Sequence, residues 1–413
     1  MELTHIDIAA SPDRPRTVRL TGFVRYDDPR GGPAEEAYWY EVPEAFASAL
    51  TDSGNPWLVG LLPVAVAFGE PLVVSRPVDA ELLDHVHELM GAWRRWLPGR
   101  MPVRIEAERA NPRDIAPEAP SRTASYFSGG VDSFFTAMRP RADPVHDLLL
   151  FLGSFDLVGA DTAALSRVER RMQAAADALG KTLVPVTTNQ MATRLAQSDP
   201  RYLAGHSMLA AAALALERRY SRVLIPASVD LDWTDPLASE YAFNPLSSTS
   251  RMRFDTDGIM QSRVEKIAWM AGSDAARGAL RVCFVSGGEN NCMRCPKCIR
   301  TAVALEALGG LDRWPTFGSA RLSASLVERT TVVHPQERYY FRELPPFCRA
   351  HGREDLARAV ERVLARARLH DPFRPLVRWL RRIPAVAAMT HRAEAIVQDV
   401  HPLSLQRRRG PGS

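Results

Sequence analysis

The chain has 413 residues, which is enough for two or three domains. Its composition, 46% hydrophobic and 24% charged, is that of a globular protein with a sizeable core, and it excludes a low-complexity chain. A formal net charge of +4 is too small to indicate nucleic-acid binding as a general property.

The sequence shows no sign of export or of a membrane span. The first residues lack the apolar segment of a secretory signal, and the most apolar runs, LVGLLPVAVAF and MLAAAALAL, are too short to cross a bilayer. Five cysteines, four of them clustered, argue against a secreted disulfide framework. We therefore expect a cytoplasmic protein with no membrane partner.

Residues 1–115 are expected to form an N-terminal α+β domain. The run TVRLTGFVRY alternates like a half-buried strand, residues 79–97 have helical spacing behind Asp79 as N-cap, and VRIEAE favours another strand. The following run, ERANPRDIAPEAPSRT, is rich in proline and charge and predicts a linker.

Strands and helices then alternate over residues 121–308. The apolar runs TASYF, HDLLLFL, TLVPV and RVLIPAS predict strands, and a helical pattern follows each of the first three. This alternation predicts an α/β fold with a parallel, doubly wound sheet. Residues 229–257 break the rhythm and are expected to build part of a substrate site. Residues 309–413 are expected to be a helical C-terminal region with an Arg-rich tail.

The run SYFSGGVDSFFTAM predicts a phosphate-binding loop. An apolar strand ends at Phe127, the turn comprises Ser128, Gly129, Gly130, Val131, Asp132 and Ser133, and an amphipathic helix follows. Two glycines allow a tight turn and a close approach of a ligand, and the helix directs free N–H groups and its positive dipole end at an anion. The serines add hydroxyl donors, and Asp132 is the candidate ligand of a magnesium ion on the phosphates. An ordinary Gly-rich turn is the alternative.

A second motif is a late cysteine cluster. Cys292, Cys295 and Cys298 are spaced three apart, and Cys283 lies nine residues upstream of the first. Four thiolates with two-residue gaps suit tetrahedral zinc, so we expect a structural zinc site. Free core cysteines and a redox pair are the alternatives.

The loop resembles the PP-loop of ATP pyrophosphatases, which cleave ATP between its α- and β-phosphates, and it lacks the lysine of an ordinary P-loop. With the cysteine spacing and the following Arg300, residues 121–308 resemble the 7-cyano-7-deazaguanine synthase (QueC-like) family. The resemblance implies a HUP-type (adenine nucleotide α-hydrolase-like) core, ATP, magnesium, zinc and an adenylated carboxylate attacked by ammonia to give an amide and then a nitrile.

The plan of a leading domain and a late cysteine knuckle is also similar to the ATP-dependent muropeptide epimerase (MurL-like) family. That family inverts a terminal L-glutamate in a peptidoglycan precursor, so this resemblance implies that the same activation ends in loss of an acidified α-proton. This second resemblance rests on the size of the chain and on the order of its motifs.

Further candidates are single residues. His206 begins a very apolar helix, either as a buried or capping histidine or as a contact of nucleotide or substrate. Ser228 ends an apolar strand at the sheet edge where ligands bind, and joins the nucleotide-binding set.

Arg263 and Lys266 lie three apart on one helix and either face solvent or grip a carboxylate or phosphate. Lysine occurs only at positions 181, 266 and 297, which draws attention to Lys266 and Lys297. Lys297 and Arg300, within and beside the cysteine cluster, are further candidates for substrate contact.

The expected function is that of an ATP pyrophosphatase-type ligase, which forms AMP and pyrophosphate while activating a carboxylate for a nitrogen nucleophile in small-molecule or natural-product biosynthesis. Asp132, Ser133 and Lys266 are the expected catalytic residues. The expected partners are a small-molecule or peptide carboxylate and, as nucleophile, ammonia; a homodimer is left open. The alternatives are the epimerase and a zinc-knuckle protein that binds or modifies RNA, although the overall charge does not favour nucleic acid.

Overall fold

The computed structural model describes residues 1–28, 32–97, 99–110, 122–153, 162–199, 203–233, 240–283, 290–318, 322–332 and 334–369. Most of the predicted linker and the Arg-rich tail lie outside the described residues. The chain divides into two compact units. Unit 1 comprises Met1–Ser128, Thr136–Leu157 and Met172–Met260, and unit 2 comprises Gly129–Phe135, Val158–Arg171 and Gln261–Ser413.

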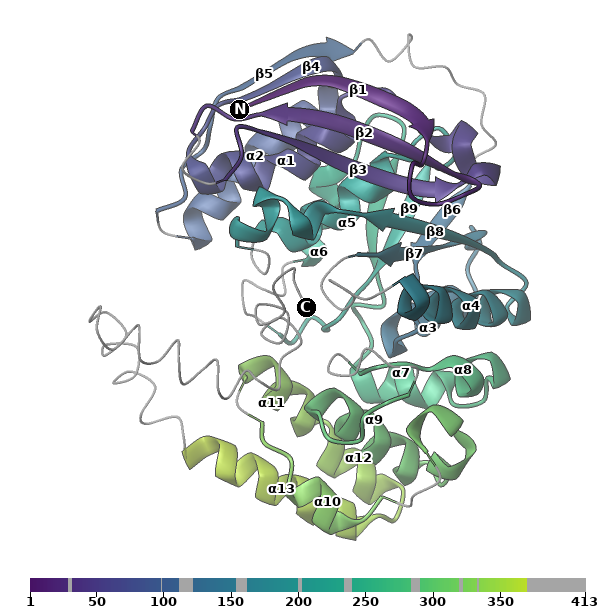
Figure 1. The fold of residues 1–413 in the computed structure, drawn as a ribbon. Coiled ribbons are helices and arrows are strands. Elements are labelled where there is room, and N and C mark those ends of the chain that lie inside the picture. The colour runs from purple at the N-terminus through teal and green to yellow at the C-terminus, as the bar shows by residue number, and fades with distance from the viewer. Residues whose placement is uncertain are drawn as a thin grey trace, which may run out of the picture. The chain divides into compact units, whose positions relative to one another are not determined.

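Strands and helices follow one another along the chain as shown in Figure 1. The strands are β1 (Glu2–Ala10), β2 (Thr17–Arg25), β3 (Glu35–Pro43), β4 (Leu72–Asp79), β5 (Ile105–Ala110), β6 (Thr123–Tyr126), β7 (Asp147–Leu152), β8 (Thr182–Thr188), β9 (Arg222–Pro226) and β10 (Arg253–Asp257). The helices are α1 (Asn55–Phe68), α2 (Ala80–Trp96), α3 (Val131–Met138), α4 (Thr162–Ala178), α5 (Gly205–Leu214), α6 (Glu240–Phe243), α7 (Arg263–Met270), α8 (Asp274–Ala279), α9 (Pro296–Ala307), α10 (Ala324–Glu328), α11 (Pro335–Arg342), α12 (Leu344–Ala350) and α13 (Glu354–Leu369).

The described strands form one 10-stranded sheet in the order β10-β9-β6-β7-β8-β3-β2-β1-β4-β5. Neighbouring strands run parallel except in the pairs β1–β2, β2–β3 and β3–β8. The fold is therefore α/β with a mostly parallel sheet, which confirms the class expected from the alternating pattern. All ten strands belong to unit 1.

The parallel strands of the predicted core follow a recognisable order. If β6 to β10 are counted along the chain from one to five, their spatial order is 3-2-1-4-5, the order of doubly wound nucleotide-binding sheets. The switch point lies between β6 and β9, which pair in parallel from Thr123↔Arg222 to Ser125↔Leu224. In such sheets, ligands bind beyond the carboxyl ends of the strands at the switch point. Ser128 and Ser228 follow these two neighbouring strands.

The N-terminal strands continue the same sheet. β3 pairs with β8 through Tyr40↔Thr188 and Glu41↔Thr187, so the regions on both sides of the predicted linker share one layer of hydrogen-bonded backbone.

Helices α1 and α2 lie against one face of the N-terminal strands (Figure 1). α1 is apolar almost all round and packs on α5, which explains why neither has a polar face. The domain boundaries expected from the sequence stay a prediction.

Asp79 is the N-cap of α2, as its place before the helical pattern predicts. Its Oδ1 accepts hydrogen bonds from the backbone N–H groups of Glu81 at 3.0 Å and Leu82 at 3.2 Å. The same carboxylate accepts from Ser250, through the backbone N–H at 3.1 Å and the hydroxyl at 2.5 Å. One buried side chain thus ends a strand, starts a helix and holds a distant loop.

Asp79→Ala is expected to lower the free energy of unfolding by about 3 kcal/mol, because it removes an N-cap, leaves the buried N–H of Leu82 without its acceptor and breaks both hydrogen bonds to Ser250. Chemical denaturation followed by circular dichroism measures the change. Asp84→Ala is the matched control, because Asp84 lies on the same helix in an exposed ion pair with Arg109. A loss at Asp79 no larger than that of the control would contradict the prediction.

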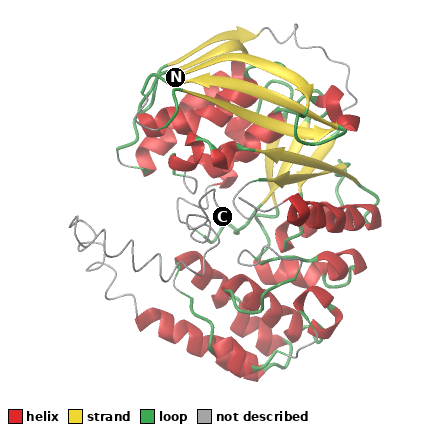
Figure 2. Ribbon diagram, in the orientation of Figure 1, coloured by secondary structure: helices red, strands yellow, loops and turns green. Residues whose placement is uncertain are grey.

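Unit 2 is helical from residue 261 onward: the described part of 261–369 contains helices and loops and no strand (Figure 2). Its helix α7 begins with a capping box, in which Ser262 and Glu265 satisfy each other's backbone N–H groups. Of the helices described, none has the length and apolar character needed to cross a membrane.

Candidate functional site

The SGGVDS turn leads from β6 into α3 through a left-handed glycine. Gly129 has φ of +74°, a conformation that a side chain would strain, so glycine is required there. Gly130 O accepts the first helical hydrogen bond from Phe134 N at 3.0 Å and a second from Ser133 Oγ at 3.0 Å. Ser128 is exposed, and Val131 and Ser133 are buried. The expected strand–turn–helix geometry is present.

A second segment of unit 2 holds this turn. The backbone N–H of Arg281 donates to Gly129 O at 2.8 Å. Arg281 stands two residues before Cys283, the first residue of the cysteine cluster. The backbone that carries the cluster is therefore hydrogen-bonded to the turn that begins α3.

Asp132, in the first turn of α3, contacts both cations that the sequence places on one helix face. Lys266 Nζ donates to Asp132 Oδ1 at 3.2 Å, and Arg263 Nη1 lies 3.1 Å from Oδ2. The side chain of Lys266 is only 2% exposed and that of Arg263 10%. The pair does not lie on a solvated face, which removes that alternative.

Electrostatics keep this cluster charged although it is buried. Burial by itself lowers the pKa of Arg263, but the neighbouring Asp132 and further acidic groups outweigh burial and raise it. Arg263 and Lys266 are therefore fixed, charged cations beside the first turn of α3. Such a place attracts an anionic group and costs little reorganisation when one binds.

Arg300 lies in the same unit, on α9. It is 3% exposed, forms an ion pair with Glu337 of α11, and its guanidinium lies 4.0 Å from the ring centroid of Tyr340. Arg263 lies 4.8 Å from the same centroid. Lys297, one turn before Arg300, is half-buried, and its carbonyl accepts from Thr301.

The four cysteines converge as expected. The sulfur atoms of Cys283, Cys292, Cys295 and Cys298 all lie within 4.8 Å of one another, with 3.8 Å between those of Cys292 and Cys298. A tetrahedral zinc ion with bonds of about 2.3 Å would set its sulfurs about 3.8 Å apart. The cluster can therefore hold a metal ion such as zinc.

Backbone geometry supports the cluster. The N–H groups of Cys295 and Cys298 donate to the sulfurs of Cys292 at 3.3 Å and Cys295 at 3.4 Å, which orients the sulfurs and stabilises thiolates. Met293 adopts φ of +52°, a strained conformation for a side chain that bends the chain between two ligands. Cys295 is also the N-cap of α9, so the cluster starts the helix that carries Arg300.

Asn291 is a supporting residue that sequence reasoning missed. Its Oδ1 accepts from the N–H groups of Val282 at 2.9 Å and Cys283 at 3.1 Å, and its Nδ2 donates to Leu280 O at 3.1 Å. The side chain is buried and joins the two arms that bring ligands to the cluster. Its place directly before Cys292 is the only signal that the sequence contains.

His206 is half-buried and lies in a hydrogen-bond network of unit 1. Asn244 donates through Nδ2 to Thr256, so its Oδ1 accepts from His206 Nδ1 at 2.9 Å, and His206 Nε2 then accepts from Ser247 Oγ at 2.7 Å. This order of groups can activate a serine, but Ser247 is fully buried. The network instead joins the start of α5 to β10, and a contact of His206 with nucleotide or substrate stays a prediction.

Acid is expected to weaken unit 1 through His206. Burial lowers its pKa from the ordinary 6.5 to about 4, so between these values the unfolded chain binds the proton more readily. Stability is therefore complete above pH 6.5 and falls by up to about 3 kcal/mol as the pH drops toward 4.

Urea denaturation at several pH values between 7 and 4.5 measures this effect. His206→Gln should flatten the pH dependence, because glutamine does not titrate, whereas His351→Gln, at an exposed position, should not. Equal pH dependence in the wild type and His206→Gln would contradict the assignment.

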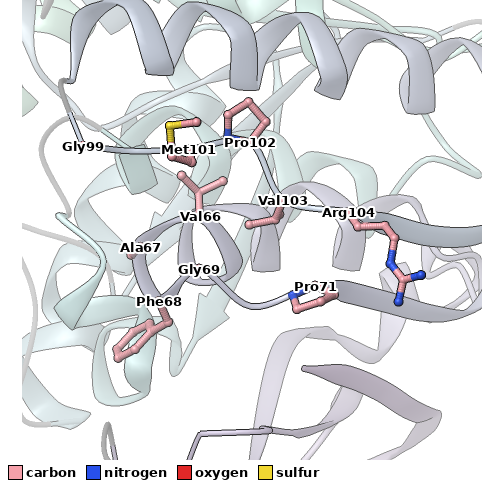
Figure 3. Close-up of a pocket in the computed structure, with 10 residues that line it drawn as sticks. All are labelled: Val66, Ala67, Phe68, Gly69, Pro71, Gly99, Met101, Pro102, Val103 and Arg104. Atoms are coloured by element: carbon pink, nitrogen blue, oxygen red, sulfur yellow. The ribbon is translucent and has the colours of Figure 1, made fainter.

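Unit 1 also contains a solvent-open recess between the end of α1 and residues 99–104 (Figure 3). Its lining includes Val66, Phe68, Met101 and Val103, and Arg104 is the one charged side chain among the lining residues. A lining without carboxylate, histidine or thiol offers no acid–base or nucleophilic chemistry. The recess carries no functional assignment.

Ser228 follows β9 and is half-buried, at the carboxyl edge that the sequence predicts. Its contact with nucleotide stays a prediction. Comparison of the chain with protein-family models, with curated proteins and with solved structures finds no match.

Proposed function

We propose that this chain is a PP-loop ATP pyrophosphatase with a HUP-type core that activates a carboxylate as an acyl-adenylate. The observation that carries the proposal is the meeting of Asp132, Arg263 and Lys266 at the first turn of α3, directly after the glycine turn. The 3-2-1-4-5 strand order, with that turn following the first strand at the switch point, supports it.

In the proposed reaction, a carboxylate oxygen of the substrate attacks the α-phosphorus of ATP. The bond from that phosphorus to the bridging oxygen breaks, and pyrophosphate leaves with the electron pair. Backbone N–H groups at Gly130, Val131 and Asp132 and the dipole of α3 stabilise the charge that moves onto the leaving group. Lys266 and Arg263 add fixed positive charge on side chains that are only 2% and 10% exposed.

Magnesium, when bound with ATP, would neutralise phosphate charge. Asp132 is the only carboxylate of residues 128–133 and is therefore the residue of the loop that would hold it. That carboxylate also forms ion pairs with Lys266 and Arg263, so we infer that Asp132 positions these two cations beside the phosphates. Ser133, whose hydroxyl donates to Gly130 O, keeps the turn closed.

The cysteine cluster supports the QueC-like form of the proposal, with zinc in a structural role. Four closed thiolate ligands leave no open coordination position for a substrate. In the second step a nitrogen nucleophile, with ammonia as the simplest case, attacks the acyl carbon, and the bond from that carbon to the AMP oxygen breaks. The product is an amide, and a second activation of its oxygen would lead to a nitrile.

The MurL-like epimerase is the second candidate. The observation that favours it is the extension of the sheet by β1–β5, together with helices α10–α13, beyond the region that carries the two motifs. A larger chain around the same activation chemistry suits a peptide substrate. The acyl-adenylate would then make the α-proton of the terminal residue acidic enough for removal and return.

The test is a panel of carboxylic acids, including peptides that end in L-glutamate, assayed with magnesium and ATP for AMP and pyrophosphate. Each acid is assayed with and without ammonia in D₂O. Amide formation supports the ligase, and deuterium at the α-carbon supports the epimerase. Retention of RNA at moderate salt, with no ATP turnover for any acid, would contradict the proposal and favour the RNA-binding alternative.

A further inference from the structure

Helix α11 lies outside the region that carries the sequence motifs. It nevertheless contacts Arg263 and Arg300, of which Arg263 pairs with Asp132 of the loop. The ring of Tyr340 has two guanidinium groups over it, that of Arg300 at 4.0 Å and that of Arg263 at 4.8 Å from the centroid. Tyr340 is 4% exposed, so water does not screen these contacts. Arg263 is in turn 3.1 Å from Asp132 of the loop.

Helix α11 and the residue that follows it contact both α9, which carries Arg300, and α7, which carries Arg263. Glu337 forms the ion pair with Arg300, and Glu343, which directly follows α11, accepts the backbone N–H of Val264 at 3.2 Å in the first turn of α7. Gln336 Nε2 donates to the Tyr340 hydroxyl at 3.1 Å, which orients the ring. One short helix therefore sets the positions of the start of α7 and of the Arg300 side chain on α9.

The cations of this assembly are fixed close together. Arg263, Lys266 and Arg300 contribute three positive charges, and Asp132, Glu337 and Glu343 contribute three negative ones. Two guanidinium groups that share one aromatic ring repel each other, and the electron-rich ring face offsets only part of that repulsion. An oligophosphate is long enough to contact both guanidinium groups and offset the rest of that repulsion.

We propose that Tyr340 is a positioning residue that holds Arg263 and Arg300 apart and oriented to receive the pyrophosphate part of the nucleotide. The inference rests on the proposed function and adds to it a residue of the C-terminal region. Tyr340 itself contacts no reacting atom. It acts through the two arginines, so an aromatic ring is required at this position and the hydroxyl is secondary.

The experiment is isothermal titration calorimetry of the full chain with inorganic pyrophosphate and, separately, with ATP. Tyr340→Leu removes the ring and is expected to weaken pyrophosphate binding about tenfold, whereas Tyr340→Phe keeps the ring and should bind within about twofold of the wild type. Phe347→Leu, an aromatic substitution on the neighbouring α12, is the matched control and should bind like the wild type.

Arg300→Gln should weaken binding to a similar degree, and the double variant with Tyr340→Leu should be little weaker than either single variant, because both remove one contact. If Tyr340→Leu does not fold, Tyr340→Met fills a similar volume without a ring and is expected to show the same tenfold loss.

Folded Tyr340→Leu or Tyr340→Met that binds pyrophosphate as tightly as the wild type would overturn the positioning role and leave the proposed function intact. An equal loss in Tyr340→Phe would overturn it as well, because the hydroxyl rather than the ring would then matter. A wild-type chain that binds neither pyrophosphate nor ATP would overturn the proposed function and this inference together.

Discussion

Lys266→Met is expected to reduce pyrophosphate release by about a thousandfold while the protein remains folded. The Lys266 side chain is 2% exposed, and its ammonium group lies 3.2 Å from Asp132 in the first turn of α3. Methionine keeps the length and apolar contacts of the lysine stem and removes only the charge. Arg263 still pairs with Asp132, so the buried carboxylate is not left alone and the fold should survive.

The measurement is a coupled assay for pyrophosphate with the best acid from the substrate panel, together with denaturation curves for each variant. Lys181→Met is the matched control: it makes the same chemical change at a half-buried lysine of unit 1 that donates to Val145 O at 2.6 Å. Lys266→Arg, which restores charge in a larger group, should recover part of the rate. Wild-type turnover in folded Lys266→Met would remove this residue from the mechanism.

Loss of the metal centre is expected to have the largest effect on stability. The purified protein should contain about one zinc ion per chain, and Cys298→Ser should lose the metal and at least about 3 kcal/mol of stability in unit 2. Cys298 is fully buried, its sulfur lies 3.8 Å from that of Cys292, and Cys295, the N-cap of α9, lies beside it. Hydrogen bonding with Cys283 raises the pKa of the Cys295 thiol, so binding of a cation by these cysteines releases protons.

Elemental analysis gives the metal content, and thermal and chemical denaturation give the stability. Cys348→Ala is the control, because Cys348 is equally buried in unit 2 and lies outside the four-cysteine cluster; it should retain one zinc ion. A protein that contains no zinc would refute the centre. A Cys298→Ser variant that is stable and holds zinc, yet is inactive, would point to a reactive sulfur instead of a structural one.

The effects of Lys266→Met and of zinc loss can be measured separately, because Lys266 and the cysteine cluster act through different contacts. The segment before Cys283 is hydrogen-bonded to the loop through Arg281 N and Gly129 O, and the cysteine cluster starts the helix that carries Arg300. Zinc removal should therefore weaken pyrophosphate binding together with stability. Lys266→Met should weaken turnover without loss of stability.

Much of this protein is determined by local sequence. The alternation of short apolar runs with helical patterns was enough to predict an α/β fold with a parallel sheet, because strand and helix periods depend on neighbouring residues. The glycine at 129 and the capping role of Asp79 could be predicted for the same reason. Cysteine spacing likewise predicted four converging sulfurs, since two-residue gaps leave little freedom for the chain between ligands.

Other features depend on contacts between residues far apart in the chain, which no local pattern encodes. The pairing of β3 with β8, which extends the core sheet into the N-terminal region, joins residues about 150 apart, as the hydrogen bond from Gln190 to Tyr40 does. The sequence left open whether Arg263 and Lys266 face solvent or a ligand; only the packing of α7 against α3 buries them at Asp132. Tyr340 and Glu337 lack any sequence signal, because an aromatic ring or a carboxylate on an amphipathic helix has many possible partners. Only the tertiary structure shows that the partners of Tyr340 are the arginines of α7 and α9, and that the partner of Glu337 is the arginine of α9.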